Sequence, residues 1–141
     1  MKLLVKKIDP RAKLPSYVHP YDAGLDLFAL EDYTVPAGQR LTEIRTGIAM
    51  AIPPGYVGLC WDKSGLASKQ GIKVMGGVID SGFRGELKLV VFNTSHEDYT
   101  FKAGEKVMQL LIQPVMNVEV EEAVELDDTS RGEGGWGSTG K

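Results

Sequence analysis

Short runs of apolar or alternating residues recur along the chain, and proline or glycine separates most of them from the next. In one such run Leu87, Leu89 and Val91 alternate with Lys88 and Val90, as residues on the two faces of a β-strand do. Short runs bounded by turn residues predict strands. The clearest runs are Gly47–Ile52, Tyr56–Trp61, Leu87–Asn93, Val107–Ile112 and Val118–Val124. Many short strands in one small chain predict an all-β sandwich, barrel or jelly roll.

Two local signals interrupt the strand pattern. The segment Ser64–Gln70 has the composition of a short helix, which we expect Ser64 to cap and Gly71 to end. Ser81-Gly82 predicts the turn of a β-hairpin within Gly76–Glu86.

The C-terminal part of the chain differs in character. Six acidic residues fall between Glu119 and Asp128, and five glycines lie between Arg131 and Gly140. A glycine-rich segment loses much conformational entropy when it becomes ordered, so it does not build a core. The sequence has no internal repeat and no sign of a second domain. We expect one domain over 1–141, with a β core at 1–128 and a flexible tail at 129–141.

Charge and cysteine content narrow the functional classes. The net charge of −3 over 141 residues argues against a protein that coats nucleic acid or an anionic membrane. No apolar run reaches the roughly 18 residues of a membrane span, and the N-terminus is too short and charged for a signal peptide. Cys60 is the only cysteine, which rules out an intrachain disulfide and is compatible with a reducing compartment. We expect Cys60 to be a small buried residue and the protein to be cytoplasmic, with a nucleus or a virus-infected cell as settings that depend on its source.

The glycine-rich tail contains residue types that bind nucleotides. Arg131, Trp136 and the pair Ser138-Thr139 stand among its glycines. Arginine binds phosphate in a forked geometry, glycine-rich bends and hydroxyls bind anions, and tryptophan stacks on flat rings. The alternative is a disordered, solvated terminus. The spacing G-x-x-x-x-G-K at 135–141 lacks the strand and the helix that a P-loop requires, so a P-loop fold is excluded.

Three further segments can be interpreted either as structural elements or as parts of a binding site. Asp62–Ala67 opens the expected helix with a lysine, a hydroxyl and a glycine, which suits either an anion site or an ordinary helix start. In the expected hairpin, Asp80 could hold a sugar hydroxyl and orient water, and Phe83 could form a flat wall. Asp26, between apolar residues, is more typical of a structural role. The two histidines lie far apart in the sequence, which disfavours a histidine-based zinc site or a serine triad.

Taken together, these segments resemble the five ordered motifs of the trimeric dUTPase family, over almost the whole chain. The matching segments are AGLDLFA (23–29), DKSGLAS (62–68), GGVIDSGFRGE (76–86), AGEKVMQLL (103–111) and RGEGGWGSTG (131–140). The resemblance implies a jelly-roll-like subunit and a homotrimer with three shared active sites. The first, second and fourth motifs of a site would come from one subunit, the third from a neighbour, and the tail from the last.

The resemblance also implies an activity and roles for residues. Water would attack the α-phosphorus of dUTP and release dUMP and pyrophosphate, with Mg²⁺ carried mainly by the triphosphate. Such an enzyme limits uracil incorporation into DNA and supplies dUMP for thymidylate synthesis. Asp80 would be catalytic, and Asp26 would reach the metal through water only. Substrate binding would fall to Lys63, Ser64, Gly65 and Gln109 for the phosphates, Val74, Gly77, Val78 and Phe83 for the nucleoside, and Arg131, Trp136, Gly137, Ser138 and Thr139 from the tail.

The chain departs from the family pattern at several of these positions. Lys63 and Lys106 stand where the family usually has arginine, which keeps the charge and loses the forked contact. Phe83 stands where it usually has tyrosine, and Trp136 where it usually has phenylalanine. These changes bear on the rate of the reaction more than on its type.

Two other functions stay open from the sequence. A dCTP deaminase shares the fold, but the glutamate that it uses for proton transfer would fall at Val90 in our register. A regulatory module that binds nucleotide without turnover is the second alternative, and the retained Asp80 and Arg131 argue against it. We expect dUTP as the partner molecule, with no nucleic acid and no membrane.

Overall fold

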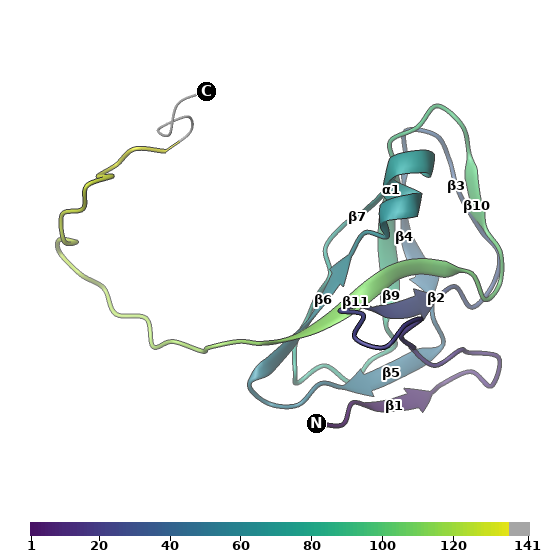
Figure 1. Cartoon of the computed structure of the whole chain (residues 1–141), viewed down its shortest axis with the longest axis horizontal. Helices are drawn as coiled ribbons and strands as arrows, with labels where there is room; N and C mark the ends of the chain where they lie inside the picture. The colour runs from purple at the N-terminus through teal and green to yellow at the C-terminus, as the bar shows by residue number, and fades with distance from the viewer. Residues whose placement is uncertain (136–141) are drawn as a thin grey trace.

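The chain folds into short antiparallel strands with a short helix at one end (Figure 1). The computed structural model describes residues 1–135, apart from the side chain of Thr42. Its elements in chain order are β1 (Leu4–Lys7), β2 (Leu25–Phe28), β3 (Tyr33–Val35), β4 (Arg40–Arg45), β5 (Ile48–Ala51), β6 (Tyr56–Trp61), α1 (Ser64–Gln70), β7 (Ile72–Val74), β8 (Val78–Ile79), β9 (Lys88–Asn93), β10 (Tyr99–Phe101) and β11 (Lys106–Pro114). The all-β prediction is confirmed.

Strands far apart in the sequence lie side by side, in a jelly-roll-like arrangement. The two larger sheets have the orders β2-β11-β6-β8 and β4-β9-β7, and β1-β5 and β10-β3 form two further ribbons. The paired strands are antiparallel throughout. Side chains from both larger sheets meet in one buried cluster, for example Leu27 and Leu110 from the first and Ile44 and Leu89 from the second. Each such side chain contributes about 1.5–3 kcal/mol when it is fully buried.

The strand predictions based on alternation hold where a partner strand is present. Along β9 the burial alternates, with Leu89 and Val91 inside and Lys88 exposed. The predicted run Tyr56–Trp61 is strand β6 with the same bounds. In contrast, the prediction of a strand at Val118–Val124 is wrong for the single chain, since this segment is extended, exposed and unpaired in the described part of the chain.

The helix has the predicted bounds but not the predicted cap. Lys63 is its N-cap, with no hydrogen bond from a capping side chain, so Ser64 is the first helical residue. The helix ends as predicted: Gly71 has φ 67°, a conformation that glycine adopts without strain, and its N–H donates to the carbonyl of Leu66. Within residues 1–135, no helix has the length and apolarity to cross a membrane.

The predicted hairpin within Gly76–Glu86 is only half right. Its turn is present, because the N–H of Phe83 donates to the carbonyl of Asp80 at 3.1 Å. Its flanking strands do not pair with each other: β8 pairs with β6 in one sheet, and β9 pairs with β4 and β7 in the other. The segment therefore crosses from one sheet to the other.

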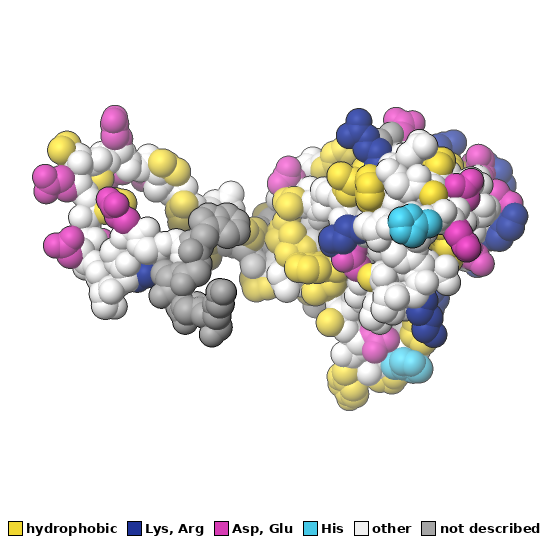
Figure 2. All heavy atoms as spheres, turned by 90° about the horizontal axis from the view of Figure 1, so that it is seen from above, with side chains coloured by type: hydrophobic (Ala, Val, Ile, Leu, Met, Phe, Trp, Pro, Cys, Tyr) yellow, Lys and Arg dark blue, Asp and Glu magenta, His cyan; other side chains and the backbone are white. Residues whose placement is uncertain are grey.

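After Pro114 the chain leaves the body as a long arm (Figure 1). Residues 115–135 are exposed throughout. Figure 2 shows the arm as a separate mass that carries several acidic side chains. Val118, Val120, Val124 and Leu126 are each at least 74% exposed, so the arm offers apolar side chains that the single chain does not bury.

Candidate active site

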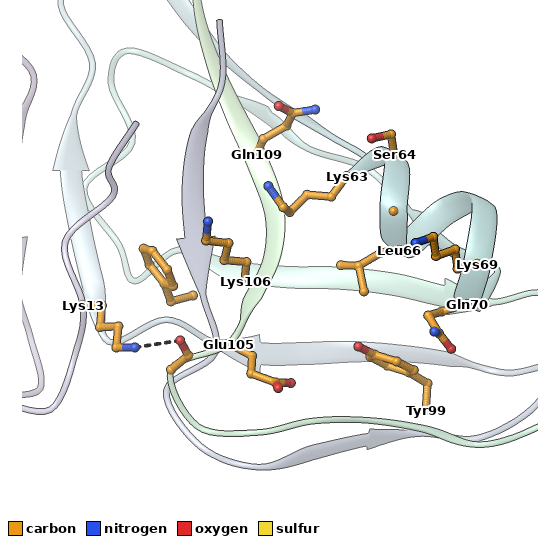
Figure 3. A pocket seen from close by; sticks show the side chains of 13 residues that line it. Lys13, Lys63, Ser64, Leu66, Lys69, Gln70, Tyr99, Glu105, Lys106 and Gln109 are labelled. Carbon is orange, nitrogen blue, oxygen red and sulfur yellow. Dashed lines mark hydrogen bonds between the residues drawn. The ribbon is translucent and has the colours of Figure 1, made fainter. Parts of the chain in front are cut away.

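A cavity of about 690 Å³ lies beside the start of α1 and the ends of β2 and β11 (Figure 3). We call it the lysine cavity, because Lys13, Lys63, Lys69 and Lys106 line it, against Glu105 as the acidic lining residue. The other lining residues are Phe28, Ser64, Gly65, Leu66, Gln70, Tyr99, Gly104 and Gln109. An excess of positive charge in a hollow of this size suits an extended anion such as a triphosphate.

Strand register explains why three of the sequence motifs meet at this cavity. Gln109 on the central strand β11 pairs with Asp26 of β2 on one side and with Trp61 of β6 on the other. The segments 23–29 and 103–111 are therefore neighbours within one sheet, and the segment 62–68 begins beside them, where β6 ends. Lys63, Ser64, Gly65 and Gln109, which the resemblance assigned to the phosphates, all line the cavity.

Asp26 is buried beside two of the cavity lysines, Lys63 and Lys106, with 3% of its side chain exposed. Lys63 Nζ donates a hydrogen bond to Oδ1, and Lys106 Nζ lies 2.7 Å from Oδ2. Burial alone raises the pKa of Asp26, but the ion pairs with Lys106 and Lys63 outweigh it and hold that pKa below its ordinary value. Asp26 thus stays charged and holds two ammonium groups at the cavity, one from β11 and one from the residue before α1 (Figure 3).

The side chain of Gln109 is held in place by a hydrogen bond to Asp62 and by the close approach of the Gly24 backbone. Its Nε2 donates to the carbonyl of Asp62 at 2.8 Å, which ties β11 to the residue that precedes Lys63. A Cβ atom at Gly24 would lie 2.9 Å from the Cβ and the Cδ of Gln109. As long as Gln109 adopts this conformation, position 24 therefore has room for no residue larger than glycine.

A second, smaller cavity of about 230 Å³ opens where β7 and β8 separate into different sheets. We call it the β7–β8 slot; its lining residues are Leu59, Cys60, Trp61, Lys73, Val74, Gly76, Gly77 and Val78. Gly77 has φ 104° and approaches β6 so closely that a Cβ would lie 2.6 Å from that of Cys60. The N–H of Cys60 donates to the carbonyl of Gly77 at 2.8 Å. Burial raises the pKa of the Cys60 thiol to about 11, as expected for an unreactive residue in a strand.

Asp80 and Phe83 follow the slot on an exposed turn. Phe83 is 42% exposed, and its ring lies over Gly85, where a Cβ would be 2.7 Å from Cζ. Arg84 stabilises the turn by donating to the carbonyls of Ser81 and Phe83 at 2.6 and 2.8 Å. Neither Asp80 nor Phe83 lines the lysine cavity or the β7–β8 slot.

The predicted site residues therefore lie in separate places. The lysine cavity and the β7–β8 slot share no lining residue. Arg131 lies on the arm, where its Nε donates to the carbonyl of Gly134 at 2.8 Å. Trp136, Gly137, Ser138 and Thr139 lie outside the described residues.

Sequence reasoning missed several residues of the two cavities. Lys13 and Lys69 line the lysine cavity, and Trp61 and Lys73 line the β7–β8 slot. Lys13 comes from an irregular segment, where its Nζ donates to the carbonyl of Gly104 at 2.8 Å. Only the three-dimensional path of the chain brings it to the cavity. Lys69 could have been found, because it lies one turn after Lys63–Gly65 on the expected helix.

Comparisons with known proteins agree on one family. The family model described as dUTPase matches residues 10–140. A deoxyuridine 5'-triphosphate nucleotidohydrolase from Clostridium kluyveri is 46% identical and aligns over 99% of both chains. The one from Paramecium bursaria Chlorella virus 1 is 44% identical over 98% of this chain and 97% of its own.

The solved structures give the same result. The Staphylococcus bacteriophage 80alpha dUTPase with dUPNHPP superposes with a TM-score of 0.92 at 29% identity, over 99% of each chain. A mutant dUTPase from phage phi11 of S. aureus, described as revealing the coordination of a structural Mg(II) ion, has a TM-score of 0.82 at 28% identity, over 89% of this chain and 98% of its own. The chain belongs to the dUTPase family.

Proposed function

We propose that the chain hydrolyses dUTP to dUMP and pyrophosphate by attack of water on the α-phosphorus. The observation that carries this proposal is the lysine cavity, where four lysines gather at the segments that match the phosphate-binding motifs of the family. Ser64, Gly65 and Gln109 orient the phosphate chain. The ammonium groups offset the negative charge that pyrophosphate gains as its bond to the α-phosphorus breaks.

The β7–β8 slot receives the uracil ring, through backbone groups of Val74, Gly77 and Val78. Uracil presents N3–H as a donor and O4 as an acceptor, and cytosine reverses both. Fixed backbone groups therefore leave an unpaired polar atom when dCTP binds, which costs about 1–3 kcal/mol. Close packing excludes the 5-methyl group of dTTP, and Phe83 packs on the deoxyribose where a 2′-hydroxyl would need room.

Asp80 is the catalytic residue in this proposal. Its carboxylate accepts hydrogen bonds from the attacking water and from the 3′-hydroxyl, so that one group orients the nucleophile relative to the sugar. The tail then closes the site: the guanidinium of Arg131 and the hydroxyls of Ser138 and Thr139 hold the γ-phosphate, next to the backbone of Gly137. Trp136 stacks on the uracil ring. Residues 129–141 act as this tail, and residues 1–128, which include the first part of the arm, make up the rest of the one domain.

Mg²⁺ accompanies the triphosphate, and the donors around Asp26 fit a contact through water. The oxygens of Asp26 already contact two ammonium groups, and residues 1–135 contain no cluster of three acidic, histidine or cysteine side chains that could hold a metal. Mg²⁺ often keeps several waters and binds through few carboxylates together with substrate phosphates. When bound, it polarises the phosphoryl oxygens.

The active sites are shared between the subunits of a homotrimer. The lysine cavity and the β7–β8 slot share no lining residue, which supports this arrangement, because two separate cavities of one chain can each take part in a different shared site. The exposed apolar side chains of the arm support it too, since a neighbouring subunit would bury them. Sedimentation equilibrium is expected to give the mass of three chains. A single-chain mass at every concentration would contradict the arrangement.

Release of pyrophosphate from dUTP, dCTP, dTTP and UTP in the presence of Mg²⁺ tests the proposed function. We expect turnover of dUTP and little turnover of the other three. Asp80→Asn is expected to retain dUTP binding and to lose turnover, and Ser81→Ala serves as its control on the same turn. Binding of dUTP without release of pyrophosphate in the wild-type protein would instead support a regulatory module, and release of ammonia from dCTP would support a deaminase. We also expect the protein to work in the cytoplasm.

A further inference from the structure

Asp62 lines neither the lysine cavity nor the β7–β8 slot, but it is hydrogen-bonded to a lining residue of each, Gln109 and Val74. It accepts three hydrogen bonds: Oδ1 from the N–H of Val74 at 2.6 Å, Oδ2 from Lys73 Nζ at 2.5 Å, and the carbonyl from Gln109 Nε2 at 2.8 Å. The side chain is 22% exposed. One short residue thus links the start of α1, strand β7 and strand β11.

The bond to Val74 occupies the edge of β7 that faces away from its partner strand. The other edge of β7 pairs with β9, and the N–H of the next residue, Met75, donates to Val90 at 3.0 Å. Successive residues of a strand direct their backbone groups to opposite edges, so the N–H of Val74 points away from β9. Val74 is also a lining residue of the β7–β8 slot. Without Asp62, its N–H would be a donor available to whatever enters the slot.

The carboxylate therefore changes which polar groups the slot presents. In a hydrogen-bonded strand pair a residue directs both its N–H and its C=O to the same edge. With the N–H taken by Asp62, position 74 presents its carbonyl acceptor alone. An acceptor suits a base that carries a hydrogen on N3, as uracil does. An open N–H would suit the bare N3 of cytosine.

We propose that Asp62 is a specificity-determining positioning residue, which masks the N–H of Val74 and so favours uracil over cytosine in the β7–β8 slot. This inference rests on the proposed function, because it takes the slot as the base site. Lys73 has a secondary part: its side chain is 58% exposed, and its ion pair holds the carboxylate of Asp62 toward β7.

Two variants separate masking from charge. Asp62→Ala removes the acceptor from Val74, and Asp62→Asn keeps an oxygen that can accept from it while it removes the charge. For Asp62→Ala we expect the ratio of kcat/KM for dUTP to that for dCTP to fall about tenfold or more, mainly through a higher KM for dUTP. Asp62→Asn is expected to keep the ratio within about threefold of wild type, because its amide oxygen still accepts from Val74 and the screened surface pair with Lys73 contributes little. Thermal unfolding checks that each variant is folded.

Two readouts do not depend on turnover. Hydrogen exchange is expected to show a protected Val74 amide in the wild type and in Asp62→Asn, and a faster one in Asp62→Ala. Calorimetry is expected to show that the wild type prefers dUMP to dCMP and that Asp62→Ala loses much of this preference. If the wild type fails to hydrolyse dUTP but these two results hold, the proposed function is wrong and the role of Asp62 stands. A folded Asp62→Ala protein with an unchanged preference, or an Asp62→Asn protein as impaired as Asp62→Ala, would overturn the masking role.

Discussion

Replacement of Asp26 by asparagine tests the electrostatics of the lysine cavity. The carboxylate has two oxygens, and each faces an ammonium group, from Lys63 and from Lys106. Asparagine has the same shape, but one of its two terminal atoms is an NH₂ donor. Since both lysines can only donate, at least one of them loses its partner whichever way the amide is oriented.

The size of the effect follows from burial. Removing one partner of a fully buried ion pair costs about 3–5 kcal/mol. Here Asp26 is 3% exposed, while the side chains of Lys63 and Lys106 are 26% and 41% exposed, so water screens the lysines and lets them move away. After this discount we expect Asp26→Asn to lower the free energy of unfolding by about 2 kcal/mol.

Urea unfolding at a fixed protein concentration measures this difference, because the stability of the proposed homotrimer would depend on concentration. The folded-state pKa of Asp26 lies below its ordinary value, so its contribution is present above the unfolded-state pKa of about 4 and disappears as the pH falls through the folded-state pKa. The difference between wild type and Asp26→Asn should therefore stay constant from about pH 5 to 8 and shrink below about pH 4. The control is Glu43→Gln, which breaks an exposed pair with Lys88 and is expected to change little. Equal stability of Asp26→Asn and wild type at pH 7, or a difference that varies between pH 6 and 8, would refute the reasoning.

Three further predictions follow from the geometry. Because burial raises the pKa of Cys60 from 9.0 to about 11, its thiolate population at pH 8 is lower by about a hundredfold, and iodoacetamide should alkylate it correspondingly more slowly than it alkylates the unfolded chain; an equal rate would contradict this. Gly24→Ala should displace Gln109 and lower stability by about 1–3 kcal/mol together with kcat/KM for dUTP, whereas Gly82→Ala, which meets no atom within 4 Å, should change stability little. Deletion of residues 131–141 should leave the fold and the assembly intact and lower kcat/KM by about a hundredfold, so a wild-type rate would remove the tail from the site.

Local sequence signals predicted a strand correctly where turn residues bound it in the sequence and a partner strand pairs with it in the fold. Strand β6 lies between a Pro-Pro-Gly turn and the start of α1, and it pairs with β11 on one side and β8 on the other. The run Val118–Val124 alternates at least as clearly, yet the single chain offers it no partner and it stays extended and exposed. Alternation therefore shows that a segment can form a strand, and the presence of a partner strand decides whether it does.

The sequence motifs predicted which residues gather at the lysine cavity, but not the contacts between them. Lys63, Ser64, Gly65 and Gln109 were assigned to the phosphates from the resemblance, and they meet in one cavity. The ion pairs of Asp26 were not predictable, because they depend on the register that sets Gln109 opposite Asp26 across β2 and β11. The separation of β8 from β9 was not predictable either, since the segment between these strands has the sequence of an ordinary hairpin.

The pairing of β2 with β11 explains how Lys63 and Lys106, which replace the family's usual arginines, fit this site. An ammonium group is a compact point charge that can donate to one buried oxygen, whereas a guanidinium presents a planar fork that needs two acceptors in one plane. Asp26 has one oxygen for each lysine, so the carboxylate accommodates Lys63 and Lys106 together. In the proposed reaction, a triphosphate that enters the cavity would compete with Asp26 for ammonium groups that are already in place. We therefore expect lysine in place of arginine to give up forked contacts to the substrate in exchange for two cations that are held in position beforehand, and to change how strongly each phosphate is held rather than the type of reaction.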